Sequence, residues 1–93
     1  MPHTAVHVMI TGRVQGVWYR GWTIQEASLR GLTGWVRNRE SGCVEALFQG
    51  KQAEIDQMID ACWVGPPAAK VNNIQISHRQ TSNFHDFQCL STL

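Results

Sequence analysis

The sequence has no apolar run of the about 18 residues that a membrane-spanning helix requires. Its N-terminus also lacks the order of basic, apolar and small residues that marks a secretory signal. Charged residues are few, at 16% of the chain, and there is no repeat or low-complexity tract. Because no segment directs the chain out of the cytoplasm or into a bilayer, we expect a cytoplasmic protein without a membrane partner.

Cysteine is also scarce, and no CxxC pair is present. Cys43, Cys62 and Cys89 are odd in number and far apart, which excludes the usual zinc and dithiol motifs. We expect reduced thiols, mostly packed in the interior. A reactive cysteine would need an exposed, electropositive setting, which sequence does not reveal.

The length of 93 residues supports one core, because a second usually appears only above roughly 150 to 200 residues. Hydrophobic residues make up 43% of the chain, too many for a disordered segment. We therefore expect a single globular domain, residues 1–93, that buries about two-thirds of its unfolded surface.

Net charge is only +1, but positive charge is concentrated in residues 13–39. That segment has one glutamate, Glu26, and five arginines: Arg13, Arg20, Arg30, Arg37 and Arg39. A local arginine excess on a nearly neutral chain favours a small anion over a nucleic-acid backbone, which usually recruits a whole basic face. A solvated surface would explain the same charges, so charge alone leaves both interpretations open.

Hydrophobic periodicity predicts six main elements and a short seventh. Alternation predicts strands at 4–12, 32–38, 43–49 and 69–77, the last with an irregularity near Asn72 and Asn73, and a short strand at 84–90. Helices are predicted at 21–30, ended by Gly31, and at 51–63, ended by Gly65 and two prolines. This order predicts an α+β, ferredoxin-like (βαββαβ) fold: an antiparallel sheet with two helices on one face and an extra C-terminal strand.

The expected core consists of the apolar residues on the shared faces of these elements. They are Val6, Val8, Ile10, Val44, Ala46, Phe48, Ile55, Met58, Ile59, Val71, Ile74, Ile76 and Phe87.

The segment ITGRVQGVWYR, residues 10–20, joins the first strand to the first helix through a loop with two glycines. Glycine permits positive φ and close backbone approach, so successive amides can point inward around an anion. The helix adds its positive end, and Arg20 can present a planar fork to two phosphate oxygens. No Lys-Ser or Lys-Thr pair follows, which excludes a Walker A loop. The same pattern is also compatible with an ordinary strand-to-helix turn that carries a surface arginine and binds no anion.

Two longer motifs carry a family resemblance. GRVQGVWYR, residues 12–20, resembles the first signature of the acylphosphatase family, and GWVRNRESGCVEALFQG, Gly34 to Gly50, resembles the second. GPPAAKV, Gly65 to Val71, is similar to the family's link between the second helix and the fourth strand. The resemblance covers the whole chain, in the order and spacing of a free-standing member.

The chain departs from the family pattern at two places. Tyr19 stands where the family usually has phenylalanine, so its hydroxyl must find a partner. The order of Leu29 and Arg30 at the end of the first helix also differs, and Arg30 interrupts the apolar stripe there.

The resemblance implies hydrolysis of the carboxyl-phosphate bond of acyl phosphates to a carboxylate and inorganic phosphate, with no cofactor and no metal. By position, Arg20 matches the phosphate-binding catalytic arginine, and Asn38 matches the asparagine that holds the attacking water. The backbone amides implied to surround the phosphoryl oxygens are those of Gln15, Gly16, Val17, Trp18, Tyr19 and Arg20.

This assignment is chemically consistent, because the leaving carboxylate has a conjugate acid with a pKa of about 4 to 5 and needs no proton. A general acid is therefore dispensable, and Glu40 is the one acidic residue in the two motif loops. The catalytic tasks that remain are to position the reactants and to stabilise charge. Backbone amides and Arg20 can stabilise the charge of a dianion, and Asn38 can position water without adding negative charge.

Two other functions use a similar topology. A single-stranded RNA binder would carry a K/R-G-F/Y-G/A-F-V-x-F/Y motif, which is absent, so we expect no nucleic-acid partner. A non-catalytic anion-binding or interaction domain, such as those inside larger carbamoyl-transfer maturation proteins, remains the alternative. The physiological acyl phosphate is not specified, and we expect a monomer because no apolar seam is evident.

Other side chains receive a structural interpretation. His3 and His7 lie on one face of the first strand, but two ligands do not make a metal site, and we expect both to face solvent. Trp35 and Arg37 are placed on the open face of the sheet, where aromatic residues commonly serve as packing or surface cover.

Overall fold

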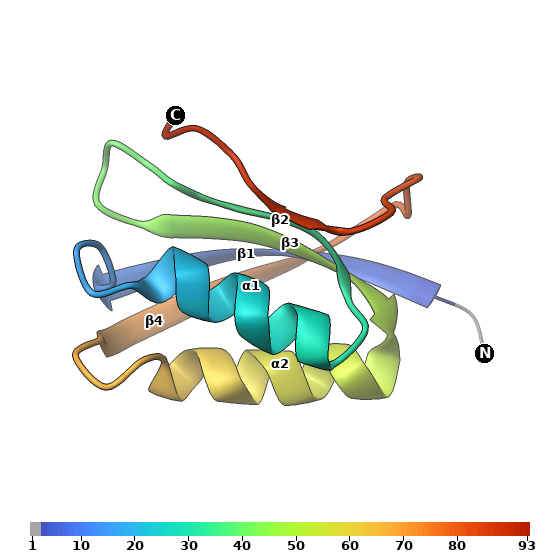
Figure 1. Ribbon diagram of the computed structural model, residues 1–93, viewed down its shortest axis with the longest axis horizontal. Helices are drawn as coiled ribbons and strands as arrows, with labels where there is room; N and C mark the ends of the chain where they lie inside the picture. The colour runs from blue at the N-terminus through green and yellow to red at the C-terminus, as the bar shows by residue number, and fades with distance from the viewer. Residues whose placement is uncertain (1–2) are drawn as a thin grey trace.

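A computed structural model describes residues 3–93, which form a layer of two helices on one face of a five-stranded sheet (Figure 1). The elements in chain order are β1 (His3–Arg13), α1 (Tyr19–Leu29), β2 (Thr33–Asn38), β3 (Val44–Lys51), α2 (Gln52–Val64), β4 (Lys70–Arg79) and β5 (Phe87–Cys89). The strand order is β4-β1-β3-β2-β5. The first four strands and both helices confirm the predicted ferredoxin-like arrangement.

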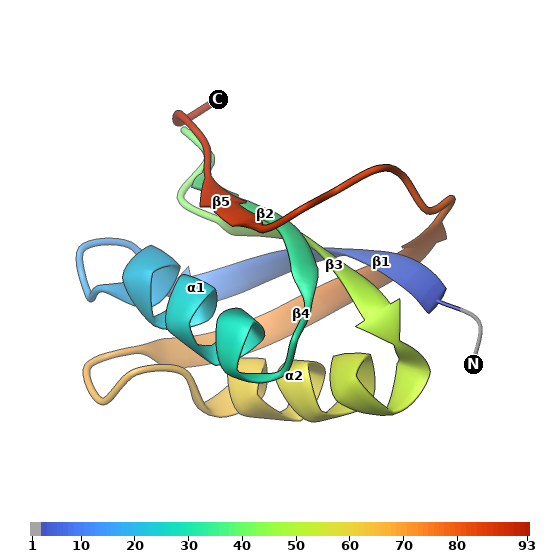
Figure 2. The ribbon, with the colours of Figure 1, turned by 45° about the vertical axis from the view of Figure 1, so that its right-hand side comes forward.

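The sheet is mixed, because β5 runs parallel to β2 while the other neighbours are antiparallel. The predicted last strand, 84–90, is too long: the strand covers Phe87–Cys89, and the chain reaches it by passing over β3. Gln49 of β3 holds that connection with two hydrogen bonds to the backbone of Ser82, at 2.7 and 2.8 Å. Figure 2 shows the connection arching from the end of β4 to β5.

Strand β1 continues past Gly12, which was expected to end it. The register between β1 and β4 shifts between Thr11 and Gly12, where one residue of β4, Asn72, has no partner. The expected irregularity near Asn72 and Asn73 is therefore confirmed. A β-bulge of this kind bends the strand and increases its twist, so the direction of the strand changes before Arg13.

The core lies between the helices and the face of the sheet that carries Val8, Ala46 and Phe48, with Val8 directly opposite Ala46. The predicted core is wrong at Ile76, which is 46% exposed because β4 is an edge strand. Ile59 and Val71 are only partly buried. Several buried apolar residues were not predicted: Ala5, Val14, Tyr19, Ala27, Leu32, Val36, Leu47 and Cys62.

Helix α1 presents a narrow buried stripe of Tyr19, Thr23 and Ala27, spaced four residues apart. Gly31, at φ 70°, closes the helix: its N–H donates to Ser28, and that of Leu32 donates to Ala27. Because the stripe ends at Ala27, the order of Leu29 and Arg30 at the end of the helix does not affect it.

Leu29 falls off the stripe and is 76% exposed. Arg30 caps the helix, and its guanidinium donates to the Glu26 carboxylate at 2.8 Å. Neither residue disturbs the contact between the helix and the sheet.

Tyr19 joins the two helices. Its ring is buried and lies 5.2 Å from the ring of Trp22, and its hydroxyl donates to the Cys62 carbonyl. Cys62 lies in the last turn of α2, where helix carbonyls lack intrahelical partners. Burial, with the contact to Cys62, raises the pKa of Tyr19 well above its ordinary value, so the hydroxyl remains a donor.

The three cysteines differ in exposure. Cys62 is buried, and burial raises its pKa to about 12, so its thiol is unreactive. Cys43 is half-buried, and Cys89 is exposed, against the expectation of mostly packed thiols. Cys89 is exposed because β5 forms the outer edge of the sheet. No helix within residues 3–93 has the length and apolar character needed to cross a membrane.

We predict that Tyr19→Phe lowers the free energy of unfolding by about 1 kcal/mol, because it leaves a buried helix-end carbonyl without its donor. Urea denaturation followed by tryptophan fluorescence measures the change. A variant as stable as the parent chain would show that the carbonyl finds another partner.

Candidate active site

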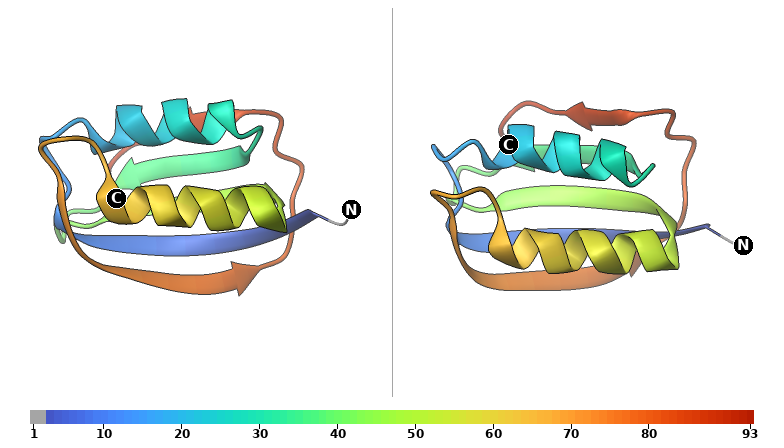
Figure 3. Two further views of the ribbon diagram at one scale, coloured as in Figure 1. Left: turned by 90° about the horizontal axis from the view of Figure 1, so that it is seen from below. Right: turned by 60° about the horizontal axis from the view of Figure 1, so that its bottom comes forward.

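Three connections meet at one end of the molecule. They are the loop 14–18 between β1 and α1, the hairpin turn 39–43 between β2 and β3, and the connection 65–69 between α2 and β4. In Figure 1 they lie at the left, and both views of Figure 3 keep the first and the last side by side. This end contains every residue that the sequence assigned to the site.

The loop 14–18 alternates in backbone handedness. Gly16 has φ 74° and Trp18 has φ 67°, whereas Val17 between them has a negative φ. Such alternation turns successive N–H groups toward one side and forms an anion-binding nest. Among residues 3–93, Trp18 is the one residue other than glycine with positive φ, a costly conformation that often occurs at functional sites.

Gly21 makes room for the Trp18 side chain. A Cβ on Gly21 would lie 2.2 Å from the indole Nε1, so the ring can fold against the first turn of α1 only because position 21 has no side chain. The indole itself is 61% exposed. Val14 at the other end of the loop is buried, and the loop is thus anchored on both sides.

The N-terminal end of α1 is not capped by a side chain, and its first turn has no acidic residue. The first N–H groups of a helix have no partners within the helix, and the helix dipole is positive there. Because no acidic residue lies in this first turn, the end of the helix remains electropositive and favours an anion.

Arg20 is the second residue of α1 and is half-buried. Within residues 3–93, no carboxylate lies within ion-pair distance of its guanidinium, whereas Arg30 and Arg39 each pair with a glutamate. The planar group therefore has no carboxylate partner among the described residues.

Asn38 is the last residue of β2, directly opposite Val44 of β3. It shares a sheet face with Val36, which is fully buried under the helices. Its Oδ1 is buried and accepts no hydrogen bond from any residue in 3–93. A buried, unpartnered acceptor is costly and rare, and Asn38 therefore stands out as a candidate functional side chain.

The side chain of Gln15 links the loop to the hairpin turn. Its Nε2 donates to the carbonyls of Arg39 and Cys43, both at 2.8 Å. The sequence pointed to Gln15 only for its backbone amide and not for this role, because the partners are 24 and 28 residues away. No pattern in the chain signals such a contact.

The opposite side of the hairpin is held by Glu45. One oxygen of its carboxylate lies 2.6 Å from His7 Nε2, and the other accepts a hydrogen bond from the Arg39 guanidinium at 3.2 Å. His7 was expected to face solvent, which is wrong: its side chain is 16% exposed, because β1 lies inside the sheet and Glu45 is near. Burial tends to raise the pKa of Glu45, but bonds from His7 and Arg39 outweigh it and hold the pKa below its ordinary value.

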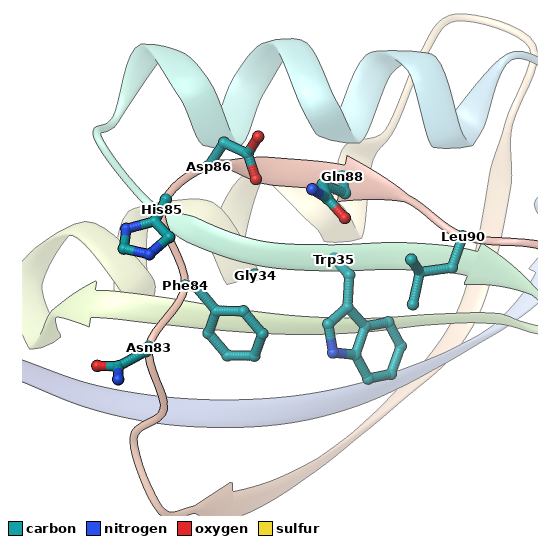
Figure 4. Close-up of a pocket in the computed structure, with 8 residues that line it drawn as sticks. All are labelled: Gly34, Trp35, Asn83, Phe84, His85, Asp86, Gln88 and Leu90. Carbon is teal, nitrogen blue, oxygen red and sulfur yellow. The ribbon is translucent and has the colours of Figure 1, made fainter.

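The open face of the sheet holds a cavity of about 440 Å³ (Figure 4). It is lined by Gly34, Trp35, Asn83, Phe84, His85, Asp86, Gln88 and Leu90. None of these residues belongs to the candidate site, and the lining has one carboxylate and no arginine or lysine, which does not suit a phosphate. Nearby, the Arg37 guanidinium lies 5.1 Å from the Trp35 ring, as expected for two residues on one face.

Known proteins with similar sequences agree on one family. The family model described as Acylphosphatase matches residues 6–89. An acylphosphatase of Pelotomaculum thermopropionicum is 40% identical over 89 residues, which are 95% of this chain and 97% of that protein. One from Rhodospirillum rubrum is 54% identical over 70 residues, 75% of this chain and 77% of that protein.

Solved structures agree with the sequences. An acylphosphatase from Coxiella burnetii superposes with a TM-score of 0.92 at 34% identity, over 95% of this chain and 93% of that one. Full-length HypF, in a phosphate- and nucleotide-bound form, gives a TM-score of 0.90 at 27% identity. There the match covers 98% of this chain but 12% of HypF.

We predict that Glu45→Gln lowers the free energy of unfolding by about 1.5 to 3 kcal/mol near neutral pH, because two hydrogen bonds to a charged group are weakened. The folded carboxyl is more acidic than the unfolded one, whose pKa is 4.5. The contribution of the Glu45 carboxylate to the free energy of unfolding is therefore complete above pH 4.5. It disappears as the pH falls through the pKa of the folded state.

The stability gap between Glu45→Gln and the parent should narrow as the pH falls from about 5 to about 3. Chemical denaturation at a series of pH values measures it, with the exposed Glu40→Gln as the control. A gap that stays constant over that range would refute the ionised network.

Proposed function

Because this chain belongs to the acylphosphatase family and is an enzyme that hydrolyses acyl phosphates, we propose how its own residues perform the reaction. The amides from Gln15 to Arg20 bind the phosphoryl group, Arg20 stabilises its charge, and Asn38 holds the attacking water. The products are a carboxylate and inorganic phosphate.

The phosphoryl group carries its negative charge on oxygens that spread around the phosphorus in the transition state. The alternating backbone at Gly16, Val17 and Trp18 supports a ring of N–H donors for these oxygens. Donors that are fixed before the reaction stabilise charge without reorganising, which is the main way an enzyme lowers this barrier. The uncapped N-terminal end of α1 adds to the same field.

Arg20 supplies the one full positive charge of the proposed site. A guanidinium forms two parallel bonds to two phosphoryl oxygens, a geometry that an ammonium cannot match. Because Arg20 has no carboxylate partner among residues 3–93, binding a dianion breaks no existing ion pair.

Asn38 provides the observation that carries the proposal: a buried amide oxygen without a protein partner, on the strand end beside the phosphate loop. That oxygen can accept a hydrogen bond from water and aim its lone pair at phosphorus. A neutral amide adds no negative charge next to a dianionic substrate, whereas an aspartate would.

We propose that water attacks directly, without a metal or a general acid. The carboxylate leaves without a proton, because the pKa of its conjugate acid is about 4 to 5. Glu40, the acidic residue of the motif loops, is exposed in the hairpin turn and is not required. The proposal therefore predicts full activity in the presence of a chelator.

The alternative is a non-catalytic anion-binding or interaction domain of the same fold. The likeness to HypF favours this alternative, because the region of HypF that matches this chain is 12% of the much longer HypF chain. We prefer a catalytic domain, residues 1–93, that acts as a cytoplasmic monomer on a small acyl phosphate and has no nucleic-acid or membrane partner. The near-neutral charge supports this choice.

We predict that Arg20→Gln lowers kcat/KM for benzoyl phosphate at least ~10² to 10³-fold, because one charge-assisted donor is lost. Hydrolysis is followed in buffer with a chelator, and exposed Arg79→Gln serves as the control. A parent chain without hydrolysis would favour the binding domain, and an Arg20→Gln variant with normal kcat/KM would remove Arg20 from the mechanism.

We predict that Asn38→Ala lowers kcat about 10²-fold and changes the inhibition constant of inorganic phosphate much less, because the amide positions water rather than phosphate. Steady-state kinetics with phosphate as competitive inhibitor separates the two effects, with exposed Asn83→Ala as the control. Near-normal kcat in Asn38→Ala would exclude the assigned role.

A further inference from the structure

The two hydrogen bonds of the Gln15 side chain connect the two halves of the proposed site. Gln15 lies in the phosphate loop, and its amide donates both of its protons to the hairpin turn, to the carbonyls of Arg39 and Cys43. Arg39 directly follows Asn38 in the chain. The bond thus joins the loop to the residue next to the proposed water-binding side chain.

The hairpin turn does not need Gln15 in order to close. The Arg39 N–H already donates to the Cys43 carbonyl at 2.9 Å, and the Gly42 N–H donates to the Arg39 carbonyl at 3.0 Å. Each carbonyl oxygen has two lone pairs, and Gln15 takes the second one of each. Its bonds are an addition to a complete turn, which points to a task other than folding the turn.

The sheet brings the loop and the turn to the same end, but its ladder does not extend to them. Pairing between β1 and β3 ends at Ile10 and Val44, and beyond this pair the two chains separate. Within residues 3–93, the bonds of Gln15 are the hydrogen bonds that cross between segments 14–18 and 39–43. Among the described residues, Gln15 is therefore the side chain that ties the phosphate loop directly to the turn following Asn38.

We infer that Gln15 is a positioning residue that sets Asn38 at the distance for in-line attack on the phosphoryl group; this inference rests on the proposed function. An error of about 1 Å in the approach of a nucleophile can cost about 10²-fold in rate. Gln15 acts through Arg39 and Asn38 and does not touch the reacting atoms through its side chain.

The chemistry of an amide suits this task. Glutamine offers two donors without a charge, and each of the two carbonyls has a second lone pair that can accept one. A glutamate would place a carboxylate against two carbonyl oxygens and beside an anionic substrate. Glu45 holds the Arg39 guanidinium, so both the backbone and the side chain of Arg39 are fixed.

The test compares Gln15→Met with Gln49→Met. Methionine has nearly the length of glutamine but no donor, and the backbone amide of residue 15 is retained. Gln49 also makes two bonds to a distant backbone, at Ser82, and lies outside the proposed site, which makes it a matched control for lost stability. Both variants are assayed with benzoyl phosphate and with inorganic phosphate as inhibitor.

We expect Gln15→Met to lower kcat about 10 to 10²-fold and to change the phosphate inhibition constant less than about threefold. Gln49→Met should keep the parent kcat. In the Asn38→Ala background, Gln15→Met should cost less than about threefold, because a residue that acts through Asn38 has nothing left to position. Gln15→Asn keeps the amide but is too short to reach the two carbonyls, so it should show the same loss of kcat. It provides a second variant in case Gln15→Met misfolds.

Three results would overturn the inference: an unchanged kcat in Gln15→Met and Gln15→Asn, equal losses of kcat and phosphate affinity, or the full loss in the Asn38→Ala background. Failure of the proposed function is different, because the parent chain itself would then lack hydrolysis. Hydrogen exchange at the Arg39 and Gly42 amides adds a readout independent of activity: exchange should accelerate in Gln15→Met and not in Gln49→Met.

Discussion

The antiparallel pairing of β1 with β3 is the constraint on which the site depends. Its register places Val6 opposite Phe48 and Val8 opposite Ala46, and it ends with Ile10 opposite Val44. A shift by one residue would turn every one of these side chains to the other face of the sheet. The buried face therefore determines that the loop after β1 and the turn before β3 emerge together.

Around this pair, the two sides of the proposed site have different origins. The loop and Arg20 come from the crossover into α1, which Tyr19 fastens to the last turn of α2. Asn38 comes from the hairpin, whose turn Gln15 holds by the backbone and Glu45 by the Arg39 guanidinium. Rigid supports of this kind matter because the proposed chemistry consists of positioning and charge stabilisation rather than proton transfer.

The charge balance of this end is consistent with its small substrate. Three arginines of residues 13–39 are engaged elsewhere: Arg30 pairs with Glu26, Arg39 pairs with Glu45, and Arg37 lies over Trp35 on the open face. Arg20, at the start of α1, has no carboxylate partner in residues 3–93 and can serve the proposed site. One focused charge with oriented donors suits a phosphoryl group better than an extended polyanion.

The sequence alone determined the order of elements and the residues proposed for the site, because alternation, helix-ending glycines and two motifs depend on neighbours a few residues apart. It did not determine the exposure of Ile76 or the burial of Tyr19, which follow from how far the helices cover the sheet. Only the tertiary structure decided that Gln15 reaches the hairpin and that Glu45 reaches His7, 38 residues away. Such contacts depend on strand register and on the packed distance between elements, quantities that no local pattern contains.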